Sequence, residues 1–329
     1  MRVLMICPEL PRLESPGTMA PGARQIESLR RLGLSIDVVD MRGIPKLKYL
    51  QVIPRIRRLV RDVDVIHAHF GYCGWLGYLA PVLTRPRKPL VVSFMGSDLL
   101  GSPYNVQGDL HRFSKFMVRI NKKLAWKASR VIVKSAEMAG VIAPAPSVVI
   151  PNGVDVELFR PIDRVSARTE LGLPLDRKLV LFPGNPDDPR KNHALAAEAT
   201  RIASSISDQS IDLVPLWRVQ PEQVAVYMNA CDVMVMTSLL EGSPNVVKEA
   251  MACNTPVVGV PVGDVEQLLE GVEGCEFCSR DPNEVGDAIL RAFQAPHVAA
   301  RESILERGLD SESVARRIST VYEQALGDD

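Results

Sequence analysis

Two glutamates eight positions apart, Glu241 and Glu249, are the residues whose type and spacing first suggest chemistry in this chain. A buried strand is predicted at Val233–Thr237 and a helix at Pro244–Ala252, so Glu241 would lie in the loop that connects them. Glu249 would lie about a turn and a half into the helix, on the face of Asn245. One carboxylate could then contact a sugar and the other a ribose. The spacing alone fits equally well an ordinary helix with one capping and one surface glutamate.

The start of this helix is predicted to offer unpaired backbone amides. Ser243 is a good N-cap, and Pro244 is a good first helical residue. Together with the helix dipole, the free N–H groups of the first turn form a ready site for a diphosphate. Asn254 tolerates the left-handed conformation and is expected to end the helix. The residues placed at this anion site are Gly242, Ser243, Pro244, Asn245 and Val246.

Short continuous apolar runs alternate with helical patterns along the first half of the chain. Strands of a parallel sheet are covered on both faces and read as such runs, so the alternation indicates an α/β fold with a doubly wound parallel sheet. Strands are expected at Arg2–Cys7, Ser35–Asp40, Val63–His67, Leu90–Phe94 and Arg130–Lys134. Helices are expected at Gly22–Leu32, Tyr49–Val63, Trp75–Val82 and His111–Ala128.

The second half repeats this alternation and predicts a second Rossmann-like domain. Strands are expected at Lys178–Phe182, Val233–Thr237 and Pro256–Val260, and helices at His193–Ser204, Pro221–Ala230, Pro244–Ala252, Val265–Leu269, Glu284–Phe293 and Ser311–Ala325. We expect domains at 1–150 and 151–310, with a terminal helix in 311–329 that packs back toward the first domain. Since ligands of such sheets bind beyond the carboxyl ends of the strands, a cleft between the domains is the expected site.

The net charge of zero conceals two oppositely charged halves. Of the 39 Lys and Arg residues and the 39 Asp and Glu residues, residues 1–150 hold 23 and 10, and the remainder hold 16 and 29. A split of this size is unusual within one compact domain. It indicates two bodies with different partners.

The composition, 46% apolar and 24% charged, is that of a globular protein. The apolar run in MRVLMICPEL is shorter than the roughly 7–15 residues of a signal-peptide core, and no run approaches the ~20 residues of a membrane span. We therefore expect a cytoplasmic protein. Six cysteines in apolar segments suit a reducing compartment, and the pair Cys275 and Cys278 lacks the further ligands of a zinc site.

The segment from Glu241 to Cys253, E-G-S-P-N-V-V-K-E-A-M-A-C, resembles the Glu-x7-Glu motif of family 4 retaining glycosyltransferases with the GT-B fold. The segments Ile150–Pro161 and 262–264 (Val-Gly-Asp) are similar to other parts of that family. The resemblance implies that Glu241 approaches the donor sugar and that Glu249 binds the nucleotide ribose.

The resemblance also implies an Arg and a Lys that bind the diphosphate after the first strand of the second domain. Lys191 matches this Lys, while Asn185, after Gly184, stands where the family has the Arg. Arg190 is the candidate for the missing charge. A solvated pair of basic residues in a loop is the plainer alternative for Arg190 and Lys191.

Three candidates lie in the first domain. Gly17 could let the donor phosphate approach the backbone closely, or simply form a turn. Asp98 follows Met95, which stands where the family often has a sugar-contacting His, so Asp98 either orients substrate or caps a helix. His67 and His69 lie at the end of a predicted strand. The resemblance implies that this segment lines the acceptor side of the site. No neighbouring carboxylate ligands point to a metal site.

Two helices of the first domain are strongly basic. The stretch Tyr49–Val63 carries four arginines, and His111–Arg130 carries seven Lys and Arg residues. Such faces could bind anionic lipid, at roughly 1 kcal/mol per cation near the membrane, or nucleic acid, or could simply be solvated. We favour an anionic membrane surface and expect no nucleic-acid partner, because the family commonly builds polysaccharides or glycolipids at the inner membrane face.

The resemblance, together with the basic first domain, implies a retaining, metal-independent glycosyltransferase at the inner face of the plasma membrane. It would move a sugar from a UDP- or GDP-sugar to a polyprenyl-linked glycan or lipid acceptor in cell-surface polysaccharide synthesis. No cofactor is expected, because the nucleotide-sugar is a substrate. A GT-B phosphorylase, a sugar-nucleotide epimerase and a non-enzymatic nucleotide-sugar-binding protein stay open as alternatives. A nicotinamide-dependent dehydrogenase is disfavoured because Cys7–Gly22 contains no GxGxxG.

Overall fold

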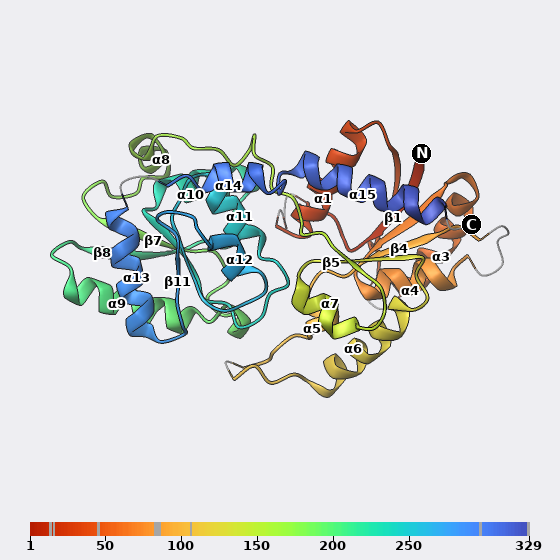
Figure 1. Ribbon diagram of the computed structural model, residues 1–329, viewed down its shortest axis with the longest axis horizontal. Coiled ribbons are helices and arrows are strands. Elements are labelled where there is room, and N and C mark those ends of the chain that lie inside the picture. Colours follow the sequence, from red (N-terminus) through yellow and green to blue (C-terminus); the bar gives the residue numbers. More distant parts are fainter. Residues whose placement is uncertain are drawn as a thin grey trace. The chain divides into compact units, whose positions relative to one another are not determined.

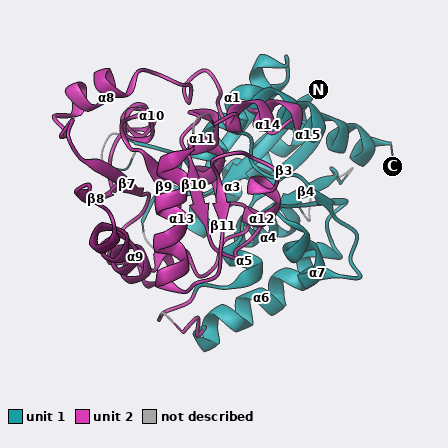
Figure 2. Cartoon of the chain, turned by 60° about the vertical axis from the view of Figure 1, so that its left-hand side comes forward, with its two compact units in different colours: residues 1–102, 110–153, 311–329 teal, residues 103–109, 154–310 magenta. Residues whose placement is uncertain are grey.

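The computed structural model describes residues 1–12, 15, 17–44, 47–81, 87–105, 107–295 and 298–327 (Figure 1). The chain forms two compact units (Figure 2). Unit 1 comprises residues 1–102, 110–153 and 311–329, and unit 2 comprises residues 103–109 and 154–310. The C-terminal segment therefore groups with the first half of the chain. No helix in the described ranges is long and apolar enough to cross a membrane.

Unit 1 is built on a parallel sheet with the strand order β2-β1-β3-β4-β5-β6. The order reverses between β1 and β3, which makes this point the topological switch of the sheet. The prediction of a doubly wound parallel sheet is confirmed. The strands are β1 (Arg2–Cys7), β2 (Ser35–Asp40), β3 (Val65–His69), β4 (Leu90–Ser93), β5 (Arg130–Val133) and β6 (Val148–Val149). Strand β3 starts and ends two residues later than predicted, so His69 lies inside it.

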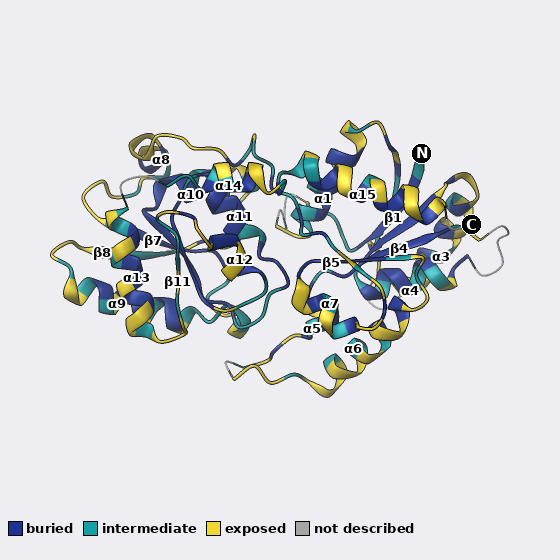
Figure 3. Ribbon diagram, in the orientation of Figure 1, coloured by how far each residue is buried: buried dark blue, intermediate teal, exposed yellow. Residues whose placement is uncertain are grey.

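Most residues of the inner strands β1, β3, β4 and β5 are buried because both faces of the sheet are covered, as Figure 3 shows. Side chains alternate between faces along a strand. Leu4 and Ile6 pack into one core, whereas Val3 and Met5 pack into the other with α1 (Ala20–Arg31). The second core is completed by side chains of α15 (Ser311–Leu326), namely Val314, Ala315, Ile318, Val321, Tyr322 and Ala325.

The remaining helices of unit 1 follow the strands. They are α2 (Lys48–Gln51), α3 (Ile53–Leu59), α4 (Gly71–Leu79), α5 (Ser97–Leu100), α6 (Arg112–Ala125) and α7 (Ala136–Ile142), with a 3-10 turn at Val60–Asp62. The single helix predicted at Tyr49–Val63 is therefore divided. Pro54 lies in the first turn of α3, where its missing N–H is tolerated, and it could not continue the preceding helix. Helix α4 starts four residues before the predicted Trp75, and the predicted end at Val82 lies outside the described residues.

Unit 2 has a second sheet with the strand order β11-β10-β9-β7-β8. All its pairs are parallel. The strands are β7 (Lys178–Phe182), β8 (Ile211–Pro215), β9 (Val233–Met236), β10 (Val257–Gly259) and β11 (Glu276–Phe277). The helices are α8 (Arg164–Leu171), α9 (His193–Ile206), α10 (Pro221–Ala230), α11 (Asn245–Ala252), α12 (Val265–Leu269), α13 (Pro282–Gln294) and α14 (Ala300–Glu306), with η2 at Pro189–Lys191.

Candidate active site

Two loops of unit 2 meet because the strands that precede them are neighbours in the sheet. Strands β7 and β9 pair in parallel, so their carboxyl ends lie at the same edge. The loop after β9 is tied to the loop after β7 by two contacts. The Thr237 hydroxyl donates to the Lys191 carbonyl at 3.0 Å, and the Leu239 amide donates to the Arg190 carbonyl at 2.8 Å. The backbone that carries Glu241 is thereby held beside the backbone that carries the two basic residues.

Three predicted catalytic side chains converge at this place. The Lys191 ammonium lies 2.7 Å from Glu241 Oε1, and Arg190 Nη1 lies 3.2 Å from the same oxygen. The exposed fractions of the side chains are 14% for Glu241, 17% for Lys191 and 31% for Arg190. Because partial burial reduces solvent screening, these ion pairs are stronger than pairs on an open surface. The cluster concentrates two positive charges on one carboxylate.

The loop after β7 is shaped to hold these cations. The Asp188 carboxylate caps η2 by accepting from the Arg190 amide at 2.9 Å. Gly184 packs against the Lys191 side chain, since a Cβ at Gly184 would lie 3.1 Å from Lys191 Cγ. Asn185 accepts from the Asp187 amide at 3.1 Å and so organises the turn. Arg190 is thus the guanidinium beside Lys191, although Asn185 occupies the position where an Arg was expected.

The predicted capping of α11 by Ser243 is wrong. The helix begins at Asn245 with Pro244 as its N-cap residue, one position later than predicted, and Pro244 makes no side-chain capping hydrogen bond. The Ser243 hydroxyl is engaged elsewhere, because it accepts from Lys248 Nζ at 2.8 Å. The first turn of α11 therefore has no cap from its own N-cap residue, and an anion would be favoured at this helix N-terminus.

Inside α11, Glu249 is buried, as are most of its neighbours. The side-chain oxygen of Asn245, one turn earlier, is buried and has no hydrogen-bond partner within the described chain. Asn254 adopts a φ of 56° after the last turn and ends the helix, as predicted. Its side-chain oxygen accepts from the Arg301 amide at 2.8 Å. The contact of Glu249 with a ribose stays a prediction.

Two charged residues near this site were missed by the sequence reasoning. Lys248 is fully buried, and Asp264, in the loop after β10, is almost so. Burial raises the pKa of Asp264, whereas the charge of Lys248 and a hydrogen bond from Ser243 act in the opposite direction. A lysine within the apolar run of α11 was the available signal. From α11, Lys248 thus interacts with Ser243 in the Glu241 loop and with the charge of Asp264 in the loop after β10.

The loop after β10 also touches the Glu241 loop through the backbone. Gly263 has a φ of 57°, and a Cβ there would lie 2.7 Å from the Gly242 carbonyl oxygen and 2.9 Å from that of Glu241. Glycine is required at this position both by the backbone conformation and by the close approach. The position of Glu241 therefore depends on three segments of unit 2.

In unit 1, the Asp98 side chain forms hydrogen bonds with backbone amides. Its carboxylate accepts from the amides of Met95 at 3.0 Å, Gly96 at 2.9 Å and Gly71 at 3.1 Å. Burial raises the pKa of Asp98 to about 6, and the three backbone hydrogen bonds oppose this shift. Asp98 lies in the first turn of α5, and its carboxylate fixes the loop after β4 and the start of α4. A role in orienting substrate stays untested.

The two histidines of β3 are fully buried. His67 Nδ1 lies 2.6 Å from the Tyr322 hydroxyl, and its Nε2 lies 2.8 Å from the Ser93 hydroxyl. His69 Nε2 lies 3.2 Å from the Gln25 amide nitrogen, while its Nδ1 has no hydrogen-bond partner among the residues described. Burial lowers the pKa of His69 to about 3, so the ring is neutral at pH 7. The described ranges contain no group of three His, Cys, Asp or Glu residues placed to hold a metal ion.

Gly17 lies in the turn before α1. No atom of the described residues lies within 4 Å of where its Cβ would be, so packing within the chain does not require glycine there. Its predicted approach to the donor phosphate stays a prediction.

The fold and the site define a class of protein: two Rossmann-like units of parallel sheet, the architecture of GT-B glycosyltransferases. Among solved structures, a sucrose-phosphate synthase from Thermosynechococcus elongatus matches with a TM-score of 0.78 and 19% identity, over 99% of this chain and 100% of that one. HepE of Anabaena in complex with UDP and glucose matches with a TM-score of 0.72 and 18% identity, over 98% and 99%. At these identities the likeness concerns the fold.

Sequence comparisons define the family. Residues 2–158 match the model described as Glycosyltransferase Family 4, and residues 184–295 match the model described as Glycosyl transferases group 1. The putative teichuronic acid biosynthesis glycosyltransferase TuaC of Bacillus subtilis is 27% identical over 88% of this chain and 89% of its own length. D-inositol 3-phosphate glycosyltransferase 1 of Catenulispora acidiphila is 26% identical over 80% and 73%. The chain belongs to glycosyltransferase family 4 and is a glycosyltransferase of the GT-B fold.

Proposed function

We propose that this glycosyltransferase takes a sugar from a UDP- or GDP-sugar and transfers it, with retention at the anomeric carbon, to a polyprenyl-linked glycan or lipid. The observation that carries the donor half is the convergence of Lys191 and Arg190 on Glu241. A uridine donor is supported by HepE, which has been solved with UDP and glucose. An acceptor in cell-surface polysaccharide synthesis is supported by TuaC, which is named for teichuronic acid biosynthesis.

The ion pairs suggest how the donor is engaged. Lys191 and Arg190 both reach one point beside Glu241, and a diphosphate bound there would compete with the carboxylate for the two cations. Glu241 would then be released to accept hydrogen bonds from the sugar. When the bond from the anomeric carbon to the diphosphate breaks, negative charge grows on the diphosphate. Lys191, Arg190 and the amides at the start of α11 would stabilise that charge.

Donor binding is tested by the thermal shift that UDP, GDP, ADP and dTDP each produce. A nucleotide that binds only the folded protein stabilises it by about 2.7 kcal/mol at a hundred times its Kd, so the correct one should stand out. We expect Lys191→Met to reduce this shift and Arg201→Met, at an exposed arginine of α9, to leave it unchanged. Equal shifts in the wild type and in Lys191→Met would contradict the assignment.

The role of Glu241 is tested by transfer. We expect Glu241→Gln to lower the transfer rate by about 10²–10³, a loss typical of a group that acts on the reacting centre, while nucleotide binding is retained. The anomeric configuration of the product, read by NMR, tests retention. Inversion, or full activity in Glu241→Gln, would refute this part of the proposal.

We propose that neither a metal ion nor another cofactor is required, because the two side-chain cations and the helix N-terminus can balance the departing diphosphate. Transfer measured after treatment with EDTA should stay within about twofold of the untreated rate, with or without added Mg²⁺ or Mn²⁺. Loss of activity that a metal ion restores would show the opposite.

We also propose that unit 1 contacts an anionic membrane surface on the cytoplasmic side. The outward face of α6 carries two aromatic residues among cations, with Phe113 72% exposed and Phe116 55% exposed. Exposed aromatic side chains beside Lys and Arg suit the interface of an anionic membrane. The cations of this face are Arg112, Lys115, Arg119, Lys122 and Lys123.

Membrane contact is tested with vesicles of phosphatidylglycerol and phosphatidylcholine. We expect binding at low salt that falls at high salt, and weaker binding for Phe116→Ser. Trp217→Ser is the matched control, since Trp217 is an exposed aromatic residue of unit 2. No binding at low salt would remove the membrane from the proposal and leave the donor chemistry intact.

A further inference from the structure

Unit 1 contains a pocket that the donor chemistry does not use. It opens where β1 and β2 end together, since Cys7 and Asp40 are partners in register. Its volume is about 490 Å³, within the range of small-ligand sites. One side is formed by Leu10, Val38, Asp40 and Arg42, and the other by Gln51, Val52 and Arg55 of the α2–α3 segment.

The position of the pocket in the sheet favours a ligand. In doubly wound sheets ligands bind beyond the carboxyl ends of the strands, near the point where the strand order reverses. Strand β1 borders that point in unit 1, and the pocket lies on its other side, beside the last residues of the edge strand β2 and the segment that follows β1. The pocket thus lies at the edge where the fold leaves backbone and loop side chains available for recognition.

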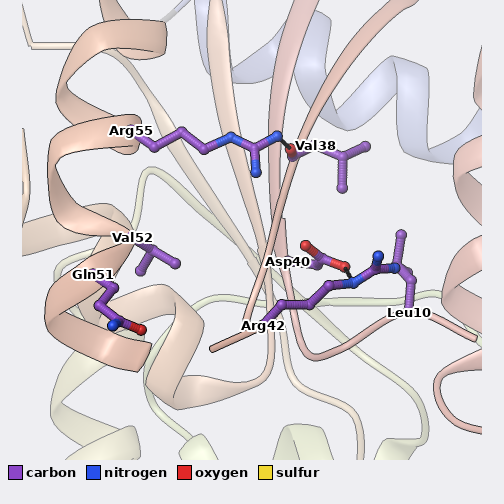
Figure 4. Close-up of a pocket in the computed structure, with 7 residues that line it drawn as sticks. All are labelled: Leu10, Val38, Asp40, Arg42, Gln51, Val52 and Arg55. Carbon is purple, nitrogen blue, oxygen red and sulfur yellow. Dashed lines mark hydrogen bonds and ion pairs between the residues drawn. The ribbon is translucent and has the colours of Figure 1, made fainter. Parts of the chain in front are cut away.

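The lining has the chemistry of a site for an acidic polar ligand. Figure 4 shows Arg55 reaching from α3 to Val38, whose carbonyl oxygen accepts from Arg55 Nη2 at 2.8 Å. This contact orients the guanidinium and uses one of its five N–H donors. Arg42 forms an ion pair with Asp40. Since the described lining contains no second acidic residue, it carries a net positive charge, which we assign to Arg55. Leu10, Val38 and Val52 supply an apolar wall.

We propose that this pocket binds an anionic sugar unit, a hexuronic acid or a sugar phosphate, with its acidic group on Arg55. A guanidinium matches a carboxylate or a phosphate with two parallel hydrogen bonds. Asp40 and Gln51 are the groups that can accept or donate hydrogen bonds to sugar hydroxyls. That the bound sugar belongs to the acceptor of the transfer rests on the proposed function. The binding of an anionic sugar in this pocket does not depend on it.

The experiment measures binding to the full chain by calorimetry with glucuronic acid, glucose 6-phosphate and glucose. We expect one or both anionic sugars to bind at least about tenfold more tightly than glucose, and Arg55→Gln to abolish that difference. Glucuronic acid distinguishes a carboxylate from the phosphate of glucose 6-phosphate. Arg58→Gln is the matched control, because Arg58 is an exposed arginine of the same helix and does not line the pocket.

Equal binding of glucose and both anionic sugars would overturn the inference, and so would an equal loss in Arg55→Gln and Arg58→Gln. UDP binding, measured in the same samples, keeps the two proposals apart. Failure of UDP to bind while anionic sugars bind through Arg55 would count against the proposed donor chemistry and support the pocket. UDP binding without discrimination among the sugars would count against the pocket alone.

Discussion

Lys248 shows how one buried charge can fix the place of a loop. It is fully buried, donates to Ser243 at 2.8 Å, and lowers the pKa of the neighbouring Asp264 against the effect of burial. A buried ammonium or carboxylate without a partner is strongly destabilising. We infer that Lys248 and Asp264 stabilise each other, and that Ser243 links their charges to the loop of Glu241.

We expect Lys248→Met to destabilise unit 2 by about 1–3 kcal/mol, because Asp264 and Ser243 lose their cationic partner. For a unit of this size, 1 kcal/mol corresponds to about 2–4 °C in the thermal midpoint. Combining Lys248→Met with Asp264→Asn should restore part of the loss, since the unpaired carboxylate is then removed. Additive losses in the double variant would show that the two residues do not interact.

His69 predicts a pH dependence. Burial lowers its pKa to about 3 from the usual value of 6.5. Between about pH 6.5 and 3, His69 is therefore protonated in the unfolded chain and neutral in the folded chain. The free energy of unfolding falls over this range as the pH falls, by about 1.4 kcal/mol per pH unit. Asp98, with a pKa raised to about 6, acts in the opposite direction between about pH 6 and 3.8.

The measurement is the slope of the unfolding free energy of unit 1 between pH 6 and 4, in the wild type and in His69→Gln. Asp98 is present in both proteins, so its contribution cancels in the comparison. We expect the slope to be smaller by about one proton in His69→Gln, because glutamine does not titrate. Parallel slopes would mean that His69 is not kept neutral by its burial.

At the scale of elements, sequence patterns predicted those segments in which local and tertiary preferences agree. Strands β1 and β7 have the predicted bounds because nearly uninterrupted apolar runs suit a sheet covered on both faces. The half-buried strand β2 also has its predicted bounds, with an aspartate inside it. The edge strand β8 was missed because Ile211–Pro215 is only half-buried and contains an aspartate.

The candidate site was predictable in part. The convergence of Lys191 on Glu241 follows from loops at the carboxyl ends of adjacent strands, which a βα alternation already implies. The capping by Ser243 was wrong because local propensity ignores a competing contact, here with Lys248. The Gly263 contact could not be predicted either, since a close approach between backbones leaves no apolar pattern in the sequence.

We expect Gly263→Ala to impair transfer by displacing the loop that carries Glu241. An alanine must adopt a positive φ and must also push back the carbonyl groups of Gly242 and Glu241. We expect transfer to fall by at least about tenfold. Gly271→Ala is the control: its φ is 73°, but no described atom lies within 4 Å of the added Cβ. Similar losses of activity in both variants would attribute the effect to backbone strain and not to the contact.

At the scale of the whole molecule, unit 1 is assembled from distant parts of the chain. Helix α15 packs against α1 and β3 in unit 1. In the sequence, residues 154–310 of unit 2 separate α15 from the rest of unit 1. The hydrogen bond between His67 and Tyr322 joins residues 255 positions apart. No local pattern predicts such a pair, because it depends on how the finished fold brings the two segments together.

We expect Tyr322→Phe to destabilise unit 1 by about 1–2 kcal/mol, because His67 Nδ1 loses its partner in a fully buried place. Hydrogen exchange of the amides of β3 and α15 should accelerate together. Tyr49→Phe, at a tyrosine that is 38% exposed and distant in sequence from β3 and α15, should leave this exchange unchanged. Faster exchange confined to α15 would show that the hydroxyl holds only the helix.

The discontinuity of unit 1 has a consequence for synthesis on the ribosome. Domains generally fold as their residues emerge, the N-terminal part first. Here unit 2 is translated completely before α15 exists, so Val3, Met5 and Ile26 cannot yet be covered by that helix while unit 2 acquires its structure. The unit that begins the chain is thus the one completed last, and its half-covered sheet is the surface of the nascent protein on which a chaperone would act.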